Sequence, residues 1–175
     1  IEKSAFFQCV QLVKVVTHKG IRKVGDFAFN NCKLLRRVNL RYAVEIDEAA
    51  FSCCENLEDV EFGDNLQTIG ESAFASCESL DLEHIELPSV VTIGAFAFMT
   101  CFRMIDIELS ERLETLGAGT FDGCVRLRRI AIPLRRDLFT FDVELEGYTQ
   151  FRYCEQLVVV DVVGGIHKTV ASLHM

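Results

Sequence analysis

A short phrase ending in cysteine recurs along the chain at a nearly constant interval. Seven of the eight cysteines follow a phenylalanine by three residues, in the pairs Phe6 and Cys9, Phe29 and Cys32, Phe51 and Cys54, Phe74 and Cys77, Phe98 and Cys101, Phe121 and Cys124, and Phe151 and Cys154. Successive phenylalanines are 23, 22, 23, 24, 23 and 30 residues apart. Self-similarity at a period of this size is typical of solenoids, whose units bury their apolar faces by stacking on one another. The repeat therefore restricts the chain to a coil of stacked units.

Each unit contains one short stretch in which apolar and polar residues alternate, as around Val38 and Leu40. Alternation over five or six residues predicts a half-buried strand, and strands of successive units should lie about 4.8 Å apart. One unit departs from the pattern, because its segment Asp81 to His84 is two residues too long and moves Ile85 into the place of the apolar strand residue. We nevertheless expect the strands of all units to form one parallel sheet.

The remainder of each unit predicts a turn followed by a helical or irregular segment. An apolar pair three residues apart precedes a small residue, as in Leu66, Ile69 and Gly70, and we interpret the small residue as the point where the backbone turns a corner. The phrase Ala-Phe-x-x-Cys then predicts one turn of α or 3₁₀ helix, with an acid such as Glu71 near its positive end. The predicted fold is an α/β repeat solenoid, a right-handed coil with short helical turns or irregular structure on the convex side.

We treat the chain as a single repeat domain, 1–175, and as a fragment of a longer array. Its divisions are a partial first unit at 1–9, units at about 10–32, 33–54, 55–77, 78–101, 102–124 and 125–154, and a terminal strand and tail at 155–175. The segment 134–151 carries about seven extra residues, where we expect a bulge or an extended loop.

Two segments carry a family resemblance. LQTIGESAFASCESL, at 66–80, and VVTIGAFAFMTCFRM, at 90–104, are similar to the BspA-type leucine-rich repeat. The resemblance covers nearly the whole chain and implies a leucine-rich-repeat coil. Family members are best known from the surfaces and secretions of bacteria and protists, where they bind other proteins, matrix or host cells. The resemblance therefore implies binding and not catalysis, and it alone favours a cell-surface or secreted location.

The repeated phenylalanines and cysteines have a structural interpretation. This predicted ladder comprises Phe29, Cys32, Phe51, Cys54, Phe74, Cys77, Phe98, Cys101, Phe121 and Cys124. Equivalent thiols that recur once per coil and point the same way suit neither a tetrahedral metal site nor disulfide geometry. We therefore interpret them as buried, apolar thiols, and we predict no disulfide among the repeated cysteines, no metal and no cofactor. Cys53 stands outside the pattern and should be more exposed.

Charge is distributed unevenly along the chain. The formal net charge is −8, and residues 1–53, 54–117 and 118–175 contribute +4, −12 and 0. Nucleic acid is an improbable partner for such a chain, because phosphate is bound mainly by Lys and Arg. No apolar run reaches the length of a membrane span, so we expect no membrane insertion.

The outward strand positions are the candidate binding residues. Because concave sheets are the usual binding surfaces of solenoids, we select Arg37, Asp59, Glu61, His84, Glu86, Asp106, Glu108 and Arg129. Acids that crowd three adjacent strands repel one another, which a protein or peptide ligand bearing Lys or Arg would relieve. The alternatives are acids that only solvate an exposed face, a structural spacer in a longer protein, and an accessory region of an enzyme.

Overall fold

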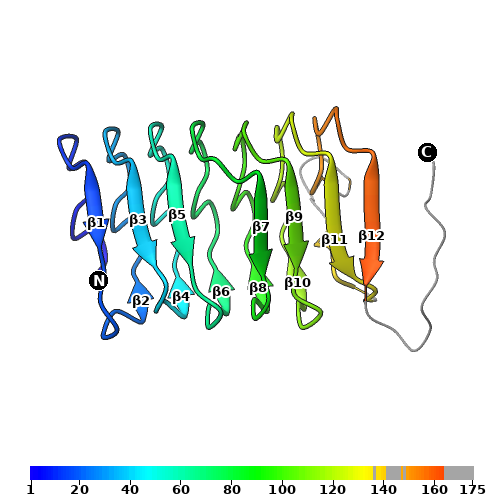
Figure 1. Cartoon of the computed structure of the whole chain (residues 1–175), viewed down its shortest axis with the longest axis horizontal. Coiled ribbons are helices and arrows are strands. Elements are labelled where there is room, and N and C mark those ends of the chain that lie inside the picture. Colours follow the sequence, from blue (N-terminus) through cyan, green and yellow to red (C-terminus); the bar gives the residue numbers. More distant parts are fainter. Residues whose placement is uncertain (136, 141–146, 148, 164–175) are drawn as a thin grey trace.

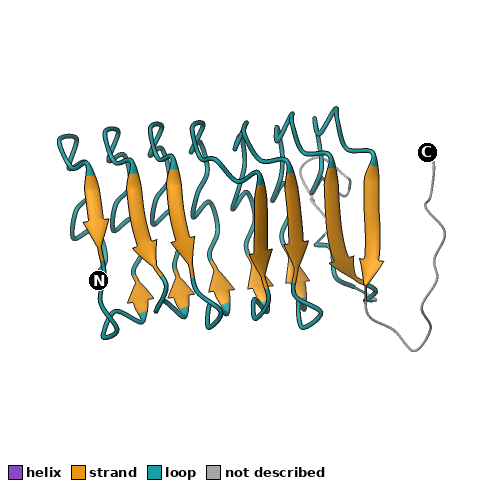
Figure 2. Ribbon diagram, viewed as in Figure 1, coloured by secondary structure: helices purple, strands orange, loops and turns teal. Residues whose placement is uncertain are grey.

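The protein is a coil of strands and turns. The computed structural model describes residues 1–135, 137–140, 147 and 149–163, and within this part of the chain there are twelve strands and no helix (Figure 2). Seven longer strands occur once per turn of the coil: β1 (Lys14–Val16), β3 (Arg37–Leu40), β5 (Asp59–Phe62), β7 (His84–Leu87), β9 (Asp106–Leu109), β11 (Arg129–Pro133) and β12 (Val159–Val163). Five two-residue strands alternate with them: β2 (Lys23–Val24), β4 (Glu45–Ile46), β6 (Thr68–Ile69), β8 (Thr92–Ile93) and β10 (Thr115–Leu116). Among the described residues no helix is long and apolar enough to cross a membrane.

Equivalent residues of successive units pair in parallel register. Val38 of β3 is paired with Val15 of β1 on one side and with Val60 of β5 on the other. The predicted strands are therefore confirmed, but the prediction of one continuous sheet is wrong. The longer strands form two sheets, in the orders β1-β3-β5 and β7-β9-β11-β12, and the short strands form a third, in the order β2-β4-β6-β8-β10.

The break between β5 and β7 follows from the two extra residues in the unit 78–101. The Asp81 N–H still donates to the Glu58 carbonyl at 3.0 Å, just before β5 begins. No further backbone hydrogen bond is described between β5 and the segment that leads from Asp81 into β7. Leu82 then turns inward and is buried, so that β7 begins beyond the reach of β5. Figure 1 shows a wider interval between β5 and β7 than between any other neighbouring long strands, whereas the short strands keep an even spacing.

The helical turn expected around each Ala-Phe-x-x-Cys phrase does not form. Two residues in the left-handed region bracket the phenylalanine, such as Ser72 (φ 53°) and Ser76 (φ 59°) around Phe74. The N–H of Phe74 donates to the Ala97 carbonyl of the next unit (2.8 Å), whereas the N–H of Ala75 stays within its own turn and donates to Ser72 (3.1 Å). In a helix, each N–H beyond the first turn donates to a carbonyl of the same segment. Because alternate N–H groups bind the next unit, the convex side is an irregular stack of turns.

The left-handed position after the phenylalanine recurs in all seven units, and the one before it recurs in six. They are Ser4, Phe27, Ala49, Ser72, Phe96 and Gly119 before the phenylalanine, and Gln8, Asn31, Cys53, Ser76, Thr100, Gly123 and Tyr153 after it. Cys53 therefore occupies a backbone position of the turn that every unit possesses, and it is partly exposed as expected.

A phenylalanine ladder runs through the core. Ring centroids of successive phenylalanines lie 5.0 to 5.8 Å apart, with interplanar angles of 2 to 7°. The five central rings, those of Phe29, Phe51, Phe74, Phe98 and Phe121, are almost completely buried. Parallel rings at this separation are offset stacks, which add to the stability that burial alone supplies.

Each repeated cysteine after the first donates a hydrogen bond to the preceding unit. The Sγ atoms of Cys54 and Cys77, for example, lie 3.2 Å from the carbonyl oxygens of Phe29 and Phe51. Burial raises the pKa of the thiols of Cys32, Cys54, Cys77, Cys101, Cys124 and Cys154, to about 12 for Cys101 and Cys154. All eight cysteines are unbridged in the structure. The thiols thus act as protonated donors between turns of the coil.

Glycine at the corner of a unit also avoids a steric clash with the unit before it. Gly94 and Gly117 are not in the left-handed region, but a Cβ there would lie 2.4 Å from the Glu71 nitrogen and 2.2 Å from the Ala95 nitrogen. Close approach of the preceding unit's backbone therefore excludes a side chain at Gly94 and Gly117, which also lie at the predicted corner between a short strand and the following turn.

Only part of the 134–151 insertion lies within the described residues. Leu138 is buried, its carbonyl accepts the Leu116 N–H (2.8 Å), and Phe139 forms a parallel bridge with Leu116. Residues 138–140 thus continue the sheet of short strands. The loop expected at 141–146 and 148, and the tail expected at 164–175, lie outside the described residues.

Candidate ligand-binding face

The outward side chains of β1, β3, β5, β7, β9, β11 and β12 form one surface, which we call the long-strand face. Strand β7 shows the alternation most clearly, because His84 and Glu86 are exposed while Ile85 and Leu87 are buried. The structure places all eight candidate residues on this face: Arg37, Asp59, Glu61, His84, Glu86, Asp106, Glu108 and Arg129.

The acids of the face are not on three adjacent strands. Glu86 and Glu108 are register partners on β7 and β9, so these two carboxylates lie on neighbouring strands. Asp59 and Glu61 belong to β5, which lies across the break in another sheet. The repulsion expected from the sequence is therefore strongest between β7 and β9 and weaker across the break, because the separation is larger there.

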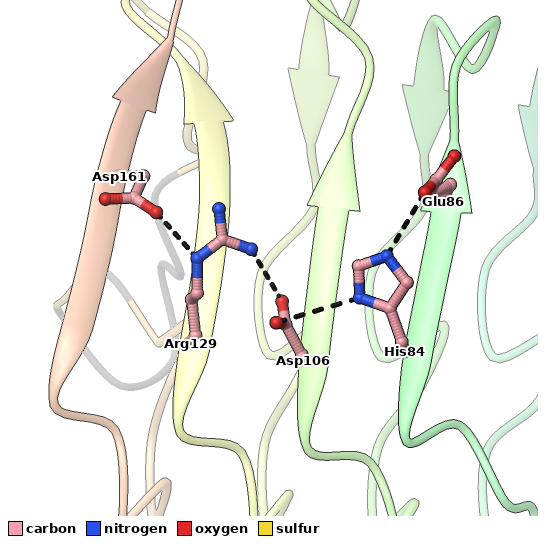
Figure 3. Close-up of polar contacts among 5 residues, drawn as sticks. All are labelled: His84, Glu86, Asp106, Arg129 and Asp161. Carbon is pink, nitrogen blue, oxygen red and sulfur yellow. Dashed lines mark hydrogen bonds and ion pairs between the residues drawn. The ribbon is translucent and has the colours of Figure 1, made fainter.

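A chain of ionic contacts crosses β7, β9, β11 and β12 (Figure 3). The His84 Nε2 lies 3.2 Å from Glu86 Oε1, and its Nδ1 lies 3.7 Å from Asp106 Oδ2. Arg129 Nη1 donates to Asp106 Oδ1 at 2.9 Å, and its Nε donates to Asp161 Oδ2 at 2.7 Å. Asp161 was not among the residues predicted from the sequence, although its outward place in a Val-rich strand was the available signal.

Arg129 is the centre of this chain because it joins carboxylates from the strands on both sides. Burial alone would lower its pKa, but hydrogen bonds to Asp161 and Asp106 outweigh that effect and raise it. The guanidinium thus remains charged, and the Asp106 carboxylate is neutralised from within the protein. Asp106 is for this reason a weaker candidate for contact with a cationic ligand than its position implied.

Glu61 is also satisfied within the protein. It accepts hydrogen bonds from the Asn39 amide and the Arg41 guanidinium, both from the neighbouring unit. Asp59 and Glu108 differ, since neither carboxylate has a hydrogen-bond or ion-pair partner among the residues that the structure describes. Neither acid is therefore in a direct ion pair, and we call the two uncompensated in this sense, although Arg37 is the register partner of Asp59 on β3.

A groove of about 530 Å³ lies where the two sheets of longer strands separate. Its lining comes from β5, from β7 and from the segment before β7, and consists of Asp59, Val60, Glu61, Phe62, Asp81, Leu82, His84, Ile85 and Glu86. Four of these nine residues are carboxylates. The groove is therefore acidic, and it contains Asp59, one of the two uncompensated acids. Within the described ranges no group of three or more His, Cys, Asp or Glu side chains is arranged to hold a metal ion.

The fold is a parallel β-solenoid of the leucine-rich-repeat type. It has one longer parallel strand per turn of the coil, a further parallel sheet of short strands, and a ladder of phenylalanines in its core. The family model of the BspA type leucine rich repeat region matches in six copies, over residues 1–89 and 78–168. The chain belongs to this family, and the resemblance noted in its sequence is confirmed.

Solved structures support the same assignment. The T. pallidum leucine rich repeat protein TpLRR is 33% identical with a TM-score of 0.78, and the match covers 90% of this chain and 70% of that one. A leucine-rich repeat protein from Bacteroides ovatus ATCC 8483 is 28% identical with a TM-score of 0.74, covering 92% of this chain and 40% of that one. The pneumococcal vaccine antigen PcpA shares the fold. It is 16% identical with a TM-score of 0.61, and the match covers 87% of this chain and 42% of that one. No match was found among curated proteins.

Proposed function

We propose that this chain is a protein-binding module whose long-strand face contacts a protein or peptide bearing Lys or Arg. Proteins built from this repeat are commonly surface or adhesin-like proteins, which supports binding as the general role. The chain spans 40% of the length of the B. ovatus protein, so the proposal concerns this repeat region alone.

The observation that carries the proposal is the uncompensated charge at Asp59 and Glu108. The other acids among the candidates have a hydrogen-bond or ion-pair partner on the same face, whereas these two have none among the described residues. Glu108 also faces Glu86 in register, and like charges on neighbouring strands destabilise a sheet by roughly 0.2–1 kcal/mol. A cationic ligand would remove this repulsion and gain charge complementarity.

The experiment compares charge reversal on the two sides of the coil. A protein and peptide array is screened with the chain, and the affinity of the best ligand is measured for wild type, Asp59→Lys/Glu108→Lys and Glu48→Lys/Glu71→Lys. Glu48 and Glu71 are exposed acids on the turns of the convex side, so the control makes the same change in net charge. We expect at least about tenfold weaker binding for the first variant and little change for the control.

Equal affinity of all three proteins would contradict the proposal, because the face would then not contact the ligand. That result would favour the interpretation of the acids as solvating groups. Circular dichroism of each variant verifies that the coil is intact before affinities are compared.

A further inference from the structure

The break in the sheet leaves two open strand edges facing each other within one molecule. Strand β5 is the last member of one sheet and β7 is the first member of the other. Edge strands present unpaired N–H and C=O groups, and proteins usually cover or shorten them. Here both edges border the acidic groove described above, on the same face of the coil.

The backbone of β5 has hydrogen-bonding groups directed at the groove. The Asp59 N–H donates to the Arg36 carbonyl on the β3 side (3.1 Å), and the Glu58 carbonyl accepts from Asp81 on the opposite side (3.0 Å). Peptide groups alternate between the two edges of a strand. The N–H and C=O of Val60 therefore point away from β3, into the groove, where no described backbone group binds them.

The side chains of the groove form an apolar floor with an acidic rim. Leu82 and Ile85 are buried, and the Phe62 ring packs edge-on against Phe74 at 5.5 Å. The rim carries the carboxylates of Asp59, Glu61, Asp81 and Glu86, together with the single imidazole of His84. Arg41 and Arg103 lie outside the lining and neutralise two of the rim acids in part, but Asp59 has no described partner.

We propose that the groove receives an extended peptide segment that adds as a strand between β5 and β7 and carries Lys or Arg at alternate positions. This inference rests on the proposed function and specifies where and how the ligand binds. Strand addition supplies affinity through backbone hydrogen bonds, and alternate side chains supply specificity. Apolar residues of the segment would face the floor while the basic residues between them face the acidic rim, which matches the period of two of an extended chain.

The test uses a capped octapeptide that alternates Lys and Val, its counterpart with N-methyl groups on alternate residues, and a counterpart with Glu in place of Lys. N-methylation removes N–H donors along one edge of the peptide and keeps its charge. We expect the methylated peptide to bind about tenfold more weakly than the unmethylated one, since several backbone hydrogen bonds are lost, and the Glu peptide to show no binding. The amide of Val60, followed by NMR, should exchange quickly in the free protein and at least about tenfold more slowly with the Lys peptide bound.

A matched pair of protein variants locates the site. Asp59→Lys changes the uncompensated acid inside the groove, and Glu108→Lys changes the one outside it. Because neither carboxylate has a described partner, both variants should fold. We expect Asp59→Lys to weaken the Lys peptide about tenfold and Glu108→Lys less than about twofold.

Two results would overturn strand addition. One is equal binding of the methylated and unmethylated peptides; the other is a Val60 amide that exchanges slowly without peptide, because the edges would then already be closed. Either result leaves the proposed function standing if the Asp59→Lys/Glu108→Lys protein still loses the array ligand. Loss of strand addition together with unchanged affinity for the array ligand would refute both.

Discussion

Truncating Phe74 to Ala removes a ring from the middle of the ladder and should be among the most damaging single changes in the chain. Its ring stacks on Phe51 at 5.3 Å and on Phe98 at 5.6 Å, and it meets Phe62 edge-on at 5.5 Å. The side chain has no exposed surface. Neighbouring units can fill the space only by moving their backbones, which parallel pairing on both sides opposes.

The expected cost follows from burial and ring contacts. Truncating a buried phenylalanine to Ala lowers the free energy of unfolding by about 3–5 kcal/mol. Because Phe74 has three aromatic neighbours, we expect a loss at the upper end of this range, near 5 kcal/mol. Phe6 is the matched control, because it ends the same ladder, is 42% exposed and, among the described residues, stacks on Phe29 alone. Phe6→Ala should cost about 2 kcal/mol, since roughly half of the ring leaves no cavity.

Urea denaturation followed by circular dichroism measures both costs. The free energy of unfolding is compared for wild type, Phe74→Ala and Phe6→Ala, after near-ultraviolet signals of the tyrosines have been used to verify a single transition. A cost for Phe74→Ala no greater than that for Phe6→Ala would refute the argument that stacking along the coil stabilises its centre.

Three further predictions follow from the core. Gly117→Ala should lower the free energy of unfolding by about 3 kcal/mol in urea denaturation, because its Cβ would overlap the preceding backbone, whereas Gly20→Ala, which meets only the flexible His18 side chain, should cost less than about 1 kcal/mol. The thiol of Cys101 stays protonated in the fold up to a pKa of about 12, so the native state binds more protons than the unfolded state above pH 9 and stability falls as pH rises. Cys101→Ala should make this decline shallower by up to about 1.4 kcal/mol per pH unit between pH 9 and 11, and an unchanged slope would contradict the assignment. Thiol titration after denaturation without reductant should count all eight cysteines as free, and bridged ladder positions would contradict the predicted absence of disulfides.

The period and the alternation were sufficient to predict which longer strands pair within each sheet and in which register, for a physical reason. In a solenoid each unit pairs only with its neighbours, so the linear order of units fixes which strands are adjacent and which residues are in register. Val38 must then lie between Val15 and Val60, and it does. Outward positions such as Arg37 and Glu108 follow from the same alternation.

The break in the sheet was not predicted, although its cause was visible. The two extra residues before His84 could have bulged outward and left β7 beside β5. They displaced β7 instead, because Leu82 is apolar and its side chain is buried. Whether Leu82 can be buried depends on the space inside the coil, which the length of the segment does not reveal. Backbone conformation was missed in the same way. A left-handed backbone is favoured by the residue types at Gly119, Gly123 and Asn31. The equivalent places in other units hold Phe96, Thr100 and Tyr153, whose residue types do not predict that conformation.

Ion pairing on the long-strand face was the least accessible feature from sequence. Asp106 and Arg129 are neighbours in register and could be matched once the strands were aligned, whereas the contact of Arg129 with Asp161 is diagonal and depends on how the guanidinium is oriented. The result changed the candidate set, because it left Asp59 and Glu108 as the uncompensated acids.

The most direct test of the binding account is the salt dependence of association. Association rate constants of the best array ligand are measured at low and high ionic strength for wild type and for Asp59→Lys/Glu108→Lys. Acids that attract a basic partner accelerate its encounter with the face, and salt screens that attraction. The account predicts fast association of wild type that slows as salt is added, and slow association of the variant with little or no such slowing. Equal rates and equal salt dependence in the two proteins would contradict it.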